Sequence, residues 1–429
     1  MDIKRDFYLN QLIERKHNGL IKVITGIRRC GKSYLLNHIF YQYLRNSGVP
    51  DSYIISFAFD SAEDLLKIGE DPVAILKGER NADPGKFLTY IAKRTTDPGE
   101  YYLLLDEVQF LDAFEGVLNS FLQHAGFDIY VTGSNSKFLS SDIITEFRGR
   151  GDELHIFPLS FSEFHSAYDG ERDDAWDEYI TYGGLPMVLA YQSHERKSAY
   201  LQTLYNETYF SDIAGRHRIQ NRAALEALTD ILASSVGSLT NPEKIADTFK
   251  SNKNKISAVT VDKYITYLKE SFLIHSARRY DVKGRKYIGS PYKFYFEDVG
   301  LRNARLNFRQ QEETHLMENI IYNELRRRGY NVDVGVVEIY STAETGKQEH
   351  LRTEIDFVVN SGTNKIYIQS AFSMETEKKV DQKLRPLKNT RDFFKKIVVV
   401  RGGRRVWTDD DGIVHMGLFE FLLNEHSVL

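Results

Sequence analysis

Residues 26–33 read GIRRCGKS and match the phosphate-binding pattern G-x-x-x-x-G-K-[ST]. Glycines let backbone N–H groups close around phosphate oxygens, and the start of a following helix adds partial positive charge. Lys32 would reach the β- and γ-phosphates, and the hydroxyl of Ser33 would ligate Mg²⁺. We therefore expect ATP and Mg²⁺ as cofactors. The expected nucleotide-binding residues are Gly26, Ile27, Arg28, Arg29, Cys30, Gly31, Lys32, Ser33 and Tyr34.

A pair of acids supplies the second part of this chemistry. The segment 101–111, YYLLLDEVQFL, has five apolar residues directly before Asp106 and Glu107, a pattern typical of a buried parallel strand with acids at its carboxyl end. Downstream of a phosphate loop, Asp106 is expected to hold the metal together with Ser33. Glu107 is expected to act as the general base for the attacking water.

Two further positions are candidates for contact with the reacting phosphate. In VTGSNS, Asn135 or Ser134 would touch the γ-phosphate or the water, although a polar turn that caps the next helix explains them nearly as well. Arg150, favoured over Arg148, would stabilise charge on the transferred group, in cis or from a neighbouring subunit. A solvated surface arginine is the alternative. The expected catalytic residues are Glu107, Lys32, Arg150 and Asn135.

The flanking segments predict how these residues are held. Residues 20–25 (LIKVIT) are a β-branched apolar run typical of a buried strand, and residues 34–44 have apolar positions at helical spacing. The loop therefore lies at a strand-to-helix turn. Residues 53–59 predict a second strand of the same parallel α/β sheet.

Whole-chain properties narrow the class of protein. The length of 429 residues suggests two to four domains, and the net charge of −4 gives no overall attraction to nucleic acid or anionic membrane. The first ten residues, MDIKRDFYLN, lack the apolar core of a secretory signal, and no apolar run is long enough to span a bilayer. We expect a cytoplasmic protein without a membrane partner. Cys30, the one cysteine, suggests thiol-sensitive activity, or simply a small residue that fits the loop.

The middle of the chain predicts two helical regions. Residues 166–224 are expected to form a helical lid, broken at 183–186 (GGLP), and residues 225–309 a winged helix. Between His275 and Gln310, nine Lys/Arg stand against three Asp/Glu, interleaved with aromatic residues. This pattern suits contact with a DNA backbone, while a protein-docking module is the alternative.

Five segments in order, GIRRCGKS, LLLDEVQ, VTGSNS, RGRGDELHIFPLSFSEF and YGGLP, resemble AAA-type P-loop ATPases of bacteria and archaea that have a C-terminal domain of unknown function. The resemblance covers essentially the whole chain. It implies an AAA-like parallel sheet with helices on both faces over residues 1–165. It also implies that Lys32, Ser33, Asp106 and Glu107 are nucleotide and metal residues, and that Arg150 is the family's arginine.

The region 310–429 resembles the restriction-endonuclease-like fold of PD-(D/E)XK nucleases. Its helix carries Glu318 and Glu324, and Asp356 in EIDFVV matches the first metal-binding position of that fold. Where Glu-x-Lys should follow, this chain has Gln369-Ser370-Ala371. The resemblance therefore implies a nuclease-like α/β domain that has lost cleavage.

The expected function is an Mg²⁺-dependent ATPase that couples its nucleotide state to rearrangement of the winged-helix and nuclease-like domains. Expected partners are ATP and ADP, with a second copy of the chain, DNA through the winged helix, and a partner protein as further candidates. The alternatives are a nucleotide-gated DNA-binding switch or defence-type protein with weak or no hydrolysis, and an active Mg²⁺-dependent DNA nuclease.

Overall fold

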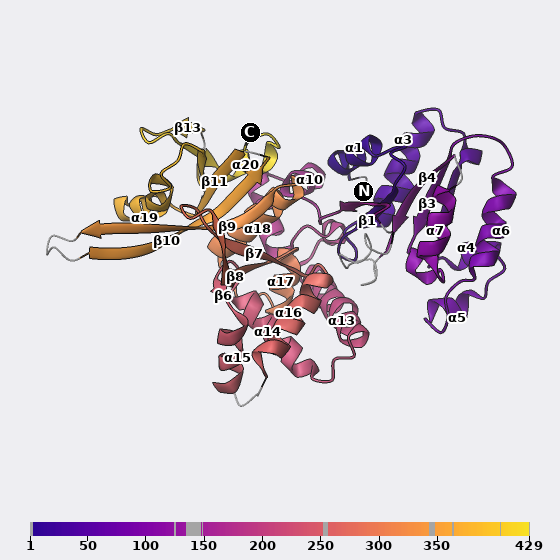
Figure 1. The fold of residues 1–429 in the computed structure, drawn as a ribbon, viewed down its shortest axis with the longest axis horizontal. Helices are drawn as coiled ribbons and strands as arrows, with labels where there is room; N and C mark the ends of the chain where they lie inside the picture. Colours follow the sequence, from indigo (N-terminus) through magenta and orange to yellow (C-terminus); the bar gives the residue numbers. More distant parts are fainter. Residues whose placement is uncertain are drawn as a thin grey trace. The chain divides into compact units, whose positions relative to one another are not determined.

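The computed structural model describes residues 3–123, 126–133, 147, 149–251, 256–342, 348–362, 364–403 and 405–428. The chain forms two compact units (Figure 1). The first consists of Met1–Pro158 with Glu270–Phe272, and the second of Leu159–Lys269 with Leu273–Leu429. Each unit has its own sheet and is described separately.

The first unit is built on five parallel strands in the order β2-β3-β4-β1-β5. Their bounds are β1 Ile21–Thr25, β2 Ile54–Ala58, β3 Tyr101–Asp106, β4 Phe127–Thr132 and β5 Gly151–His155. Every residue of β1 and β3 is buried, as the apolar runs predict for central strands of a parallel sheet. This confirms the expected α/β class.

Helices cover both faces of this sheet (Figure 1). Because side chains alternate along a strand, Ile21 and Val23 of β1 face one core, which α6 (Pro84–Arg94) and α7 (Phe114–Leu122) close with apolar residues. On the other face, the ring of Tyr130 in β4 packs 4.6 Å from that of Phe40. Phe40 belongs to the helix after the phosphate loop, which runs as α2 (Lys32–Tyr34), a π-helical turn (Leu35–Phe40) and α3 (Tyr41–Asn46). Further elements of this unit are α1 Asp6–Glu14, α4 Ala62–Lys67, α5 Pro72–Leu76 and two 3₁₀ turns, Asp51–Tyr53 and Val108–Phe110.

The second unit begins with helices. They are α10 Phe161–Ala167, α11 Arg172–Tyr182, a 3₁₀ turn Pro186–Ala190, α12 His194–Thr203, a π-helical turn Leu204–Phe210, α13 Ser211–Arg216, α14 Arg222–Ser234, α15 Pro242–Ser251, α16 Ala258–Glu270 and α17 Val299–Arg305. Asn241 accepts a hydrogen bond from the amide of Lys244, and Pro242 is the first residue of α15. Proline is favoured there because its missing N–H would be unsatisfied at a helix start.

A single nine-stranded sheet runs through the rest of this unit, in the order β13-β14-β12-β11-β10-β9-β7-β8-β6. The strands are β6 Leu239–Thr240, β7 Ile274–Asp281, β8 Lys286–Phe296, β9 Asn331–Thr342, β10 Gln348–Ser361, β11 Asn364–Ala371, β12 Lys395–Val400, β13 Trp407–Thr408 and β14 Ile413–Gly417, with helices α18 Glu313–Arg327, α19 Glu377–Lys388 and α20 Leu418–Leu423. The hairpin β7–β8 pairs with β6 at one edge and in parallel with β9 at the other. Strands that precede and strands that follow the boundary expected near residue 310 therefore belong to one continuous sheet. The domain limits stay predictions.

The two most specific sequence segments, FPLSFSEF and YGGLP, meet in space within the second unit. Leu159 N donates to Gly184 O at 2.7 Å, and a Cβ on Gly184 would lie 2.2 Å from Leu159 O. Gly184 N also donates to Oδ2 of Asp298 at 2.8 Å. Only a glycine allows this close approach of two backbones.

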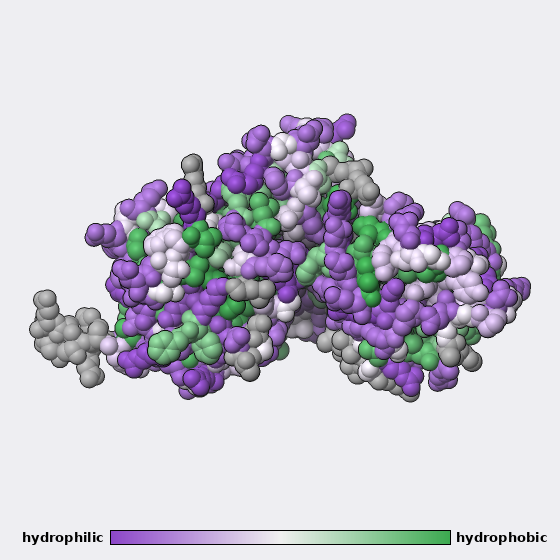
Figure 2. Space-filling view, turned by 90° about the horizontal axis from the view of Figure 1, so that it is seen from above, coloured by the Kyte–Doolittle hydropathy of each residue, from purple (hydrophilic) through white to green (hydrophobic). Residues whose placement is uncertain are grey.

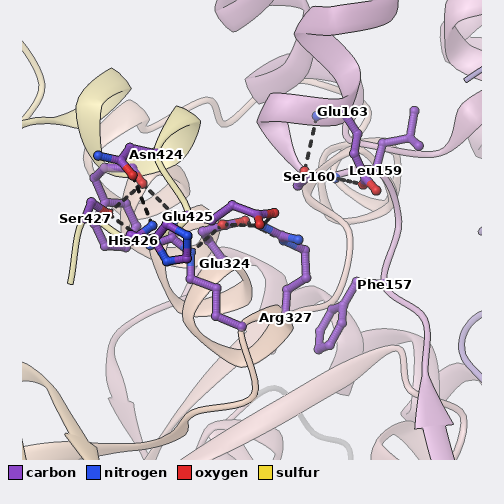
Figure 3. A network of polar contacts seen from close by, with 12 residues as sticks. Phe157, Leu159, Ser160, Glu163, Glu324, Arg327, Asn424, Glu425, His426 and Ser427 are labelled. Atoms are coloured by element: carbon purple, nitrogen blue, oxygen red, sulfur yellow. Dashed lines mark hydrogen bonds and ion pairs between the residues drawn. The ribbon is translucent and has the colours of Figure 1, made fainter. Parts of the chain in front are cut away.

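Polar contacts of Ser160 and Glu324 explain two further features of the sequence (Figure 3). Ser160 and Glu163 form a reciprocal capping box that starts α10. In α18, Glu324 is buried and accepts hydrogen bonds from Arg327 at 2.8 Å and Arg328 at 2.7 Å, while Arg327 also reaches Glu425 at 3.1 Å. Glu324 thus holds the two arginines, and Arg327 in turn connects this end of the helix to the C-terminal segment.

One face of the surface shows how polar and apolar residues are distributed. The face drawn in Figure 2 is mostly hydrophilic, with hydrophobic residues in separate small groups. Across the part of the chain that the structure describes, every helix is too short or too polar to cross a lipid bilayer.

Candidate functional site

The loop 26–33 follows β1 and turns back into α2. Gly26 has φ +139°, and a Cβ there would lie 2.2 Å from Ile156 O, so a larger residue would displace β1 from the end of β5. Gly31 and Arg29 also have positive φ, at +103° and +66°. These left-handed residues curl the backbone, as a phosphate-binding loop requires.

Buried side chains hold this curled loop in place. The guanidinium of Arg5 donates to Cys30 O at 3.1 Å and to Phe157 O at 2.8 Å. Nζ of Lys32 donates to Gly26 O at 2.9 Å and to Ile27 O at 3.0 Å. The lysine ammonium is therefore already inside the concave side of the loop. Ser33 and Tyr34 at the helix start are exposed.

Asp106, the last residue of β3, is the buried acid beside the loop. Its carboxylate accepts hydrogen bonds from the hydroxyls of Thr132 and Ser33. Burial raises the pKa of Asp106, while these two hydrogen bonds lower it and the neighbouring Glu107 raises it further. Adjacent hydroxyl and carboxylate oxygens are the donors that Mg²⁺ prefers, so Ser33 and Asp106 fit the expected metal position.

Glu107 follows in a left-handed conformation, with φ +51°. Its backbone N–H donates to Oγ1 of Thr132 at 3.2 Å, and its carboxylate accepts a hydrogen bond from the side chain of Gln109. A non-glycine residue in this region is strained, and such residues cluster at functional sites.

Three residues join this site that sequence patterns did not reveal: Asn37, Asp60 and Gln109. Thr132, the first residue of the polar segment 132–136 that the sequence indicated, also belongs to it. Asn37 Nδ2 donates to Asp106 Oδ2 at 3.2 Å, and its Oδ1 accepts from Ser56 at 3.0 Å. Asn37 follows Ser33 by four residues, a spacing that puts both side chains on the same face of a helix, so the sequence could have indicated Asn37 as a neighbour of Ser33. Partial burial, followed by the charges of Asp106 and Glu107, raises the pKa of Asp60.

Comparisons with known proteins agree with this geometry. A family model described as an AAA domain matches residues 18–165. A protein of Haemophilus influenzae, described as uncharacterized, is 32% identical over 428 residues, covering 98% of this chain and 98% of that protein. The chain belongs to the same family. Two models described as domains of unknown function, DUF8612 and DUF4143, match residues 173–312 and 313–419.

More distant relatives support the same assignment. An uncharacterized protein of Methanocaldococcus jannaschii is 29% identical over 393 residues, covering 88% of this chain and 79% of that protein. The solved Walker-type ATPase PABY2304 of Pyrococcus abyssi has a TM-score of 0.50 at 14% identity, covering 71% of this chain and 96% of that one. The family thus has an AAA-type nucleotide-binding fold, carried in this chain by the first unit.

Within the AAA domain, Arg150 is not part of the cluster. It immediately precedes β5, and its carbonyl accepts from Ile21 N at 2.8 Å, at the start of β1. The phosphate loop follows the other end of β1. Along a strand this separation is about 13 Å, and the Arg150 side chain is exposed. A role for Arg150 in hydrolysis stays a prediction that requires a second copy of the chain. Asn135, Ser134 and Arg148 lie outside the described residues.

In the second unit, the basic residues between His275 and Gln310 separate into two groups. Arg279, Lys293 and Arg302 are buried, and Arg305 is paired with Asp230 at 2.6 Å. Lys283 is half-buried, and its ammonium donates to the carbonyl of Glu338. Residues that remain on the surface are Arg278, Arg285, Lys286 and Arg309. The exposed basic surface is therefore smaller than the count of nine suggested.

Asp356, the expected remnant of a nuclease site, is buried on β10 at an irregularity in its pairing with β9. Its Oδ2 accepts from Gln369 Nε2 at 2.8 Å and from Ser370 N at 2.9 Å. The residues that replace Glu-x-Lys thus hold Asp356 by hydrogen bonds.

Proposed function

We propose that this AAA-type protein binds ATP with Mg²⁺ at Gly26–Ser33 and hydrolyses it. The observation that carries the proposal is the convergence of Ser33, Asp106 and Glu107 at the carboxyl edge of one parallel sheet, beside a loop that holds the Lys32 ammonium. Ligands bind at this edge in open parallel sheets.

Each residue has one task in this proposal. Backbone N–H groups of the loop and the ammonium of Lys32 bind the phosphates, and Ser33 with Asp106 would hold Mg²⁺. When bound, the ion neutralises charge on the phosphate oxygens. Glu107 takes a proton from the attacking water. Thr132 and Asn37 orient Asp106 through their hydrogen bonds.

Three variants test this function. We expect Lys32→Ala to lose ATP binding, measured by calorimetry with Mg²⁺. Glu107→Gln should bind ATP but lose most hydrolysis. Glu100→Gln is the matched control, because Glu100 is an exposed acid at the opposite end of the same strand, β3. Equal ATPase rates in wild type and Glu107→Gln would remove Glu107 from this role.

We further propose that the nucleotide state controls how the second unit meets a partner. The arrangement α14–β6–α15–α16–β7–β8 supports a winged helix, and the exposed Arg278, Arg285 and Lys286 with Tyr287 would contact DNA phosphates. Single-turnover ATPase rates with and without duplex DNA distinguish an ATPase coupled to DNA from a nucleotide-gated switch. Slow hydrolysis that DNA leaves unchanged favours a nucleotide-gated switch. No DNA binding at low salt favours a protein partner.

A homo-oligomer is the arrangement in which Arg150 would act. Its position at the opposite end of the sheet from the loop means that a neighbouring copy must supply it. Size-exclusion chromatography of Glu107→Gln with and without ATP tests this assembly. A monomer in both conditions removes Arg150 from catalysis.

We do not favour an active nuclease. The position of the second carboxylate is taken by Gln369, whose amide donates to Asp356. Incubation of the protein with plasmid DNA and Mg²⁺ should leave the plasmid intact.

A further inference from the structure

Lys293 is a buried lysine in the second unit that the nucleotide site does not use. It lies on β8, where it pairs with Ala277 of β7 and Leu239 of β6, and its side chain is 4% exposed. An ammonium in such a place needs compensating charge, because removing it from water costs several kcal/mol by order of magnitude.

Three carboxylates surround this ammonium. Nζ of Lys293 lies 2.9 Å from Glu318 Oε1, 2.6 Å from Glu354 Oε1 and 3.5 Å from Asp356 Oδ1. Glu318 comes from α18, whereas Glu354 and Asp356 lie two residues apart on β10, and both reach the ammonium of Lys293. Tyr295 completes the cluster, since its hydroxyl donates to Glu318 Oε1 at 2.7 Å.

Lys293 is the central cation of this cluster of three carboxylates. Burial by itself would lower the pKa of Lys293, but the charges of Glu318, Asp356 and Glu354 outweigh it and raise that pKa, so the ammonium stays protonated. Lys383 adds a second, more exposed cation, 3.4 Å from the other oxygen of Asp356. Without Lys293, the three acids would face one another with Lys383, at the outer side of Asp356, as the remaining lysine of the cluster.

Several carboxylate oxygens converging on one point form the donor set that Mg²⁺, Mn²⁺ and Ca²⁺ take in proteins. Here the point of convergence is filled by Nζ of Lys293. We propose that Lys293 is the built-in cation of this carboxylate site: it occupies the position of a divalent ion, excludes metal from the site, and ties the hairpin β7–β8 to α18 and β10.

Replacement of the lysine by an uncharged side chain of similar length tests this directly. Without metal, Lys293→Met should have a lower Tm than wild type, because the three acids lose their counter-charge. Saturating Mn²⁺ should then raise the Tm of Lys293→Met by roughly 5 °C or more, an increase that wild type does not show. Measurements are made on the full chain without nucleotide. Any Mn²⁺ effect at the AAA domain is common to all variants and is subtracted.

Two control variants make the result specific. Lys383→Met removes the neighbouring lysine and should gain no Mn²⁺ effect, because Lys293 still fills the site. The double variant Lys293→Met/Glu318→Gln has the same net charge in the cluster as wild type, but one carboxylate fewer to bind a metal. It should therefore be more stable than Lys293→Met and show no rise in Tm with Mn²⁺. If Lys293→Met is unfolded without metal, the expected result becomes folding on addition of Mn²⁺, followed by circular dichroism. A Lys293→Met chain that Mn²⁺ neither folds nor stabilises overturns the proposal, as does an equal gain in the double variant.

Discussion

The backbone N–H of Glu107 donates a hydrogen bond to Oγ1 of Thr132, with an N···O distance of 3.2 Å. Since the same hydroxyl donates to Asp106, one threonine of β4 fixes the carboxylate that ends β3 and the backbone of the residue that follows it. The position of Glu107, the proposed general base, therefore depends on the pairing of two adjacent strands, whereas the proposed phosphate-binding residues belong to the loop 26–33.

Thr132→Val should slow hydrolysis roughly 10- to 100-fold, because small displacements of catalytic groups are costly. The Kd for ATP should change little, since Thr132 does not belong to the phosphate loop. Thr132→Ser keeps the hydroxyl and should restore most of the rate. Steady-state kinetics with a separate binding titration measures both effects. A Thr132→Val enzyme as fast as wild type contradicts the positioning role.

Gly184→Ala should destabilise the second unit, because the added Cβ would meet Leu159 O at 2.2 Å. We expect a loss of about 3 kcal/mol or more in the free energy of unfolding. Gly215→Ala in α13 is the control, because its added Cβ meets nothing within 4 Å. Tryptophan fluorescence in urea reports on this unit alone, since Trp176 and Trp407 both belong to it. Equal urea midpoints for the two variants would contradict the tight contact.

Asp298 predicts a pH dependence of stability in the same unit. Burial raises the pKa of its carboxyl from 3.8 to about 6, although backbone N–H groups, including those of Gly184 and Leu301, oppose the rise. The folded state binds this proton more tightly than the unfolded state. The contribution of Asp298 to the free energy of unfolding is therefore full below pH 4 and is lost as pH rises through 6.

The non-titrating variant Asp298→Asn isolates that effect. The difference in unfolding free energy, wild type minus variant, should fall by about 3 kcal/mol between pH 4 and pH 7, from a pKa shift of about two units at 1.36 kcal/mol each. Urea unfolding at four pH values measures it. A constant difference over this range would show that Asp298 has an ordinary pKa.

Cys30 is buried inside the phosphate loop. Although a helix start favours the thiolate, alkylation requires access. We expect iodoacetamide to leave the native protein and its ATPase rate unchanged, and to modify Cys30 fully in denaturant, as mass spectrometry would show. Rapid loss of activity on alkylation, prevented by ATP, would instead support the thiol-sensitive alternative.

The sequence by itself determined those parts of the protein whose chemistry is written in contiguous residues. The loop 26–33, the apolar run that ends at Asp106 and Glu107, and the order of strands and helices in the first unit all depend on local conformation and burial. Glycine spacing and runs of apolar residues record such features directly.

Tertiary structure alone decided which distant residues meet. The pairing of β1 with β5 placed Arg150 beside the start of β1, at the opposite end of that strand from the phosphate loop. The ion pairs of Lys293 on β8 with one acid of α18 and two acids of β10 turned it from one member of a basic stretch into the counter-ion of three acids. Residues that far apart in the chain carry no shared local pattern, because their contact is set by strand register and helix packing rather than by their neighbours in sequence.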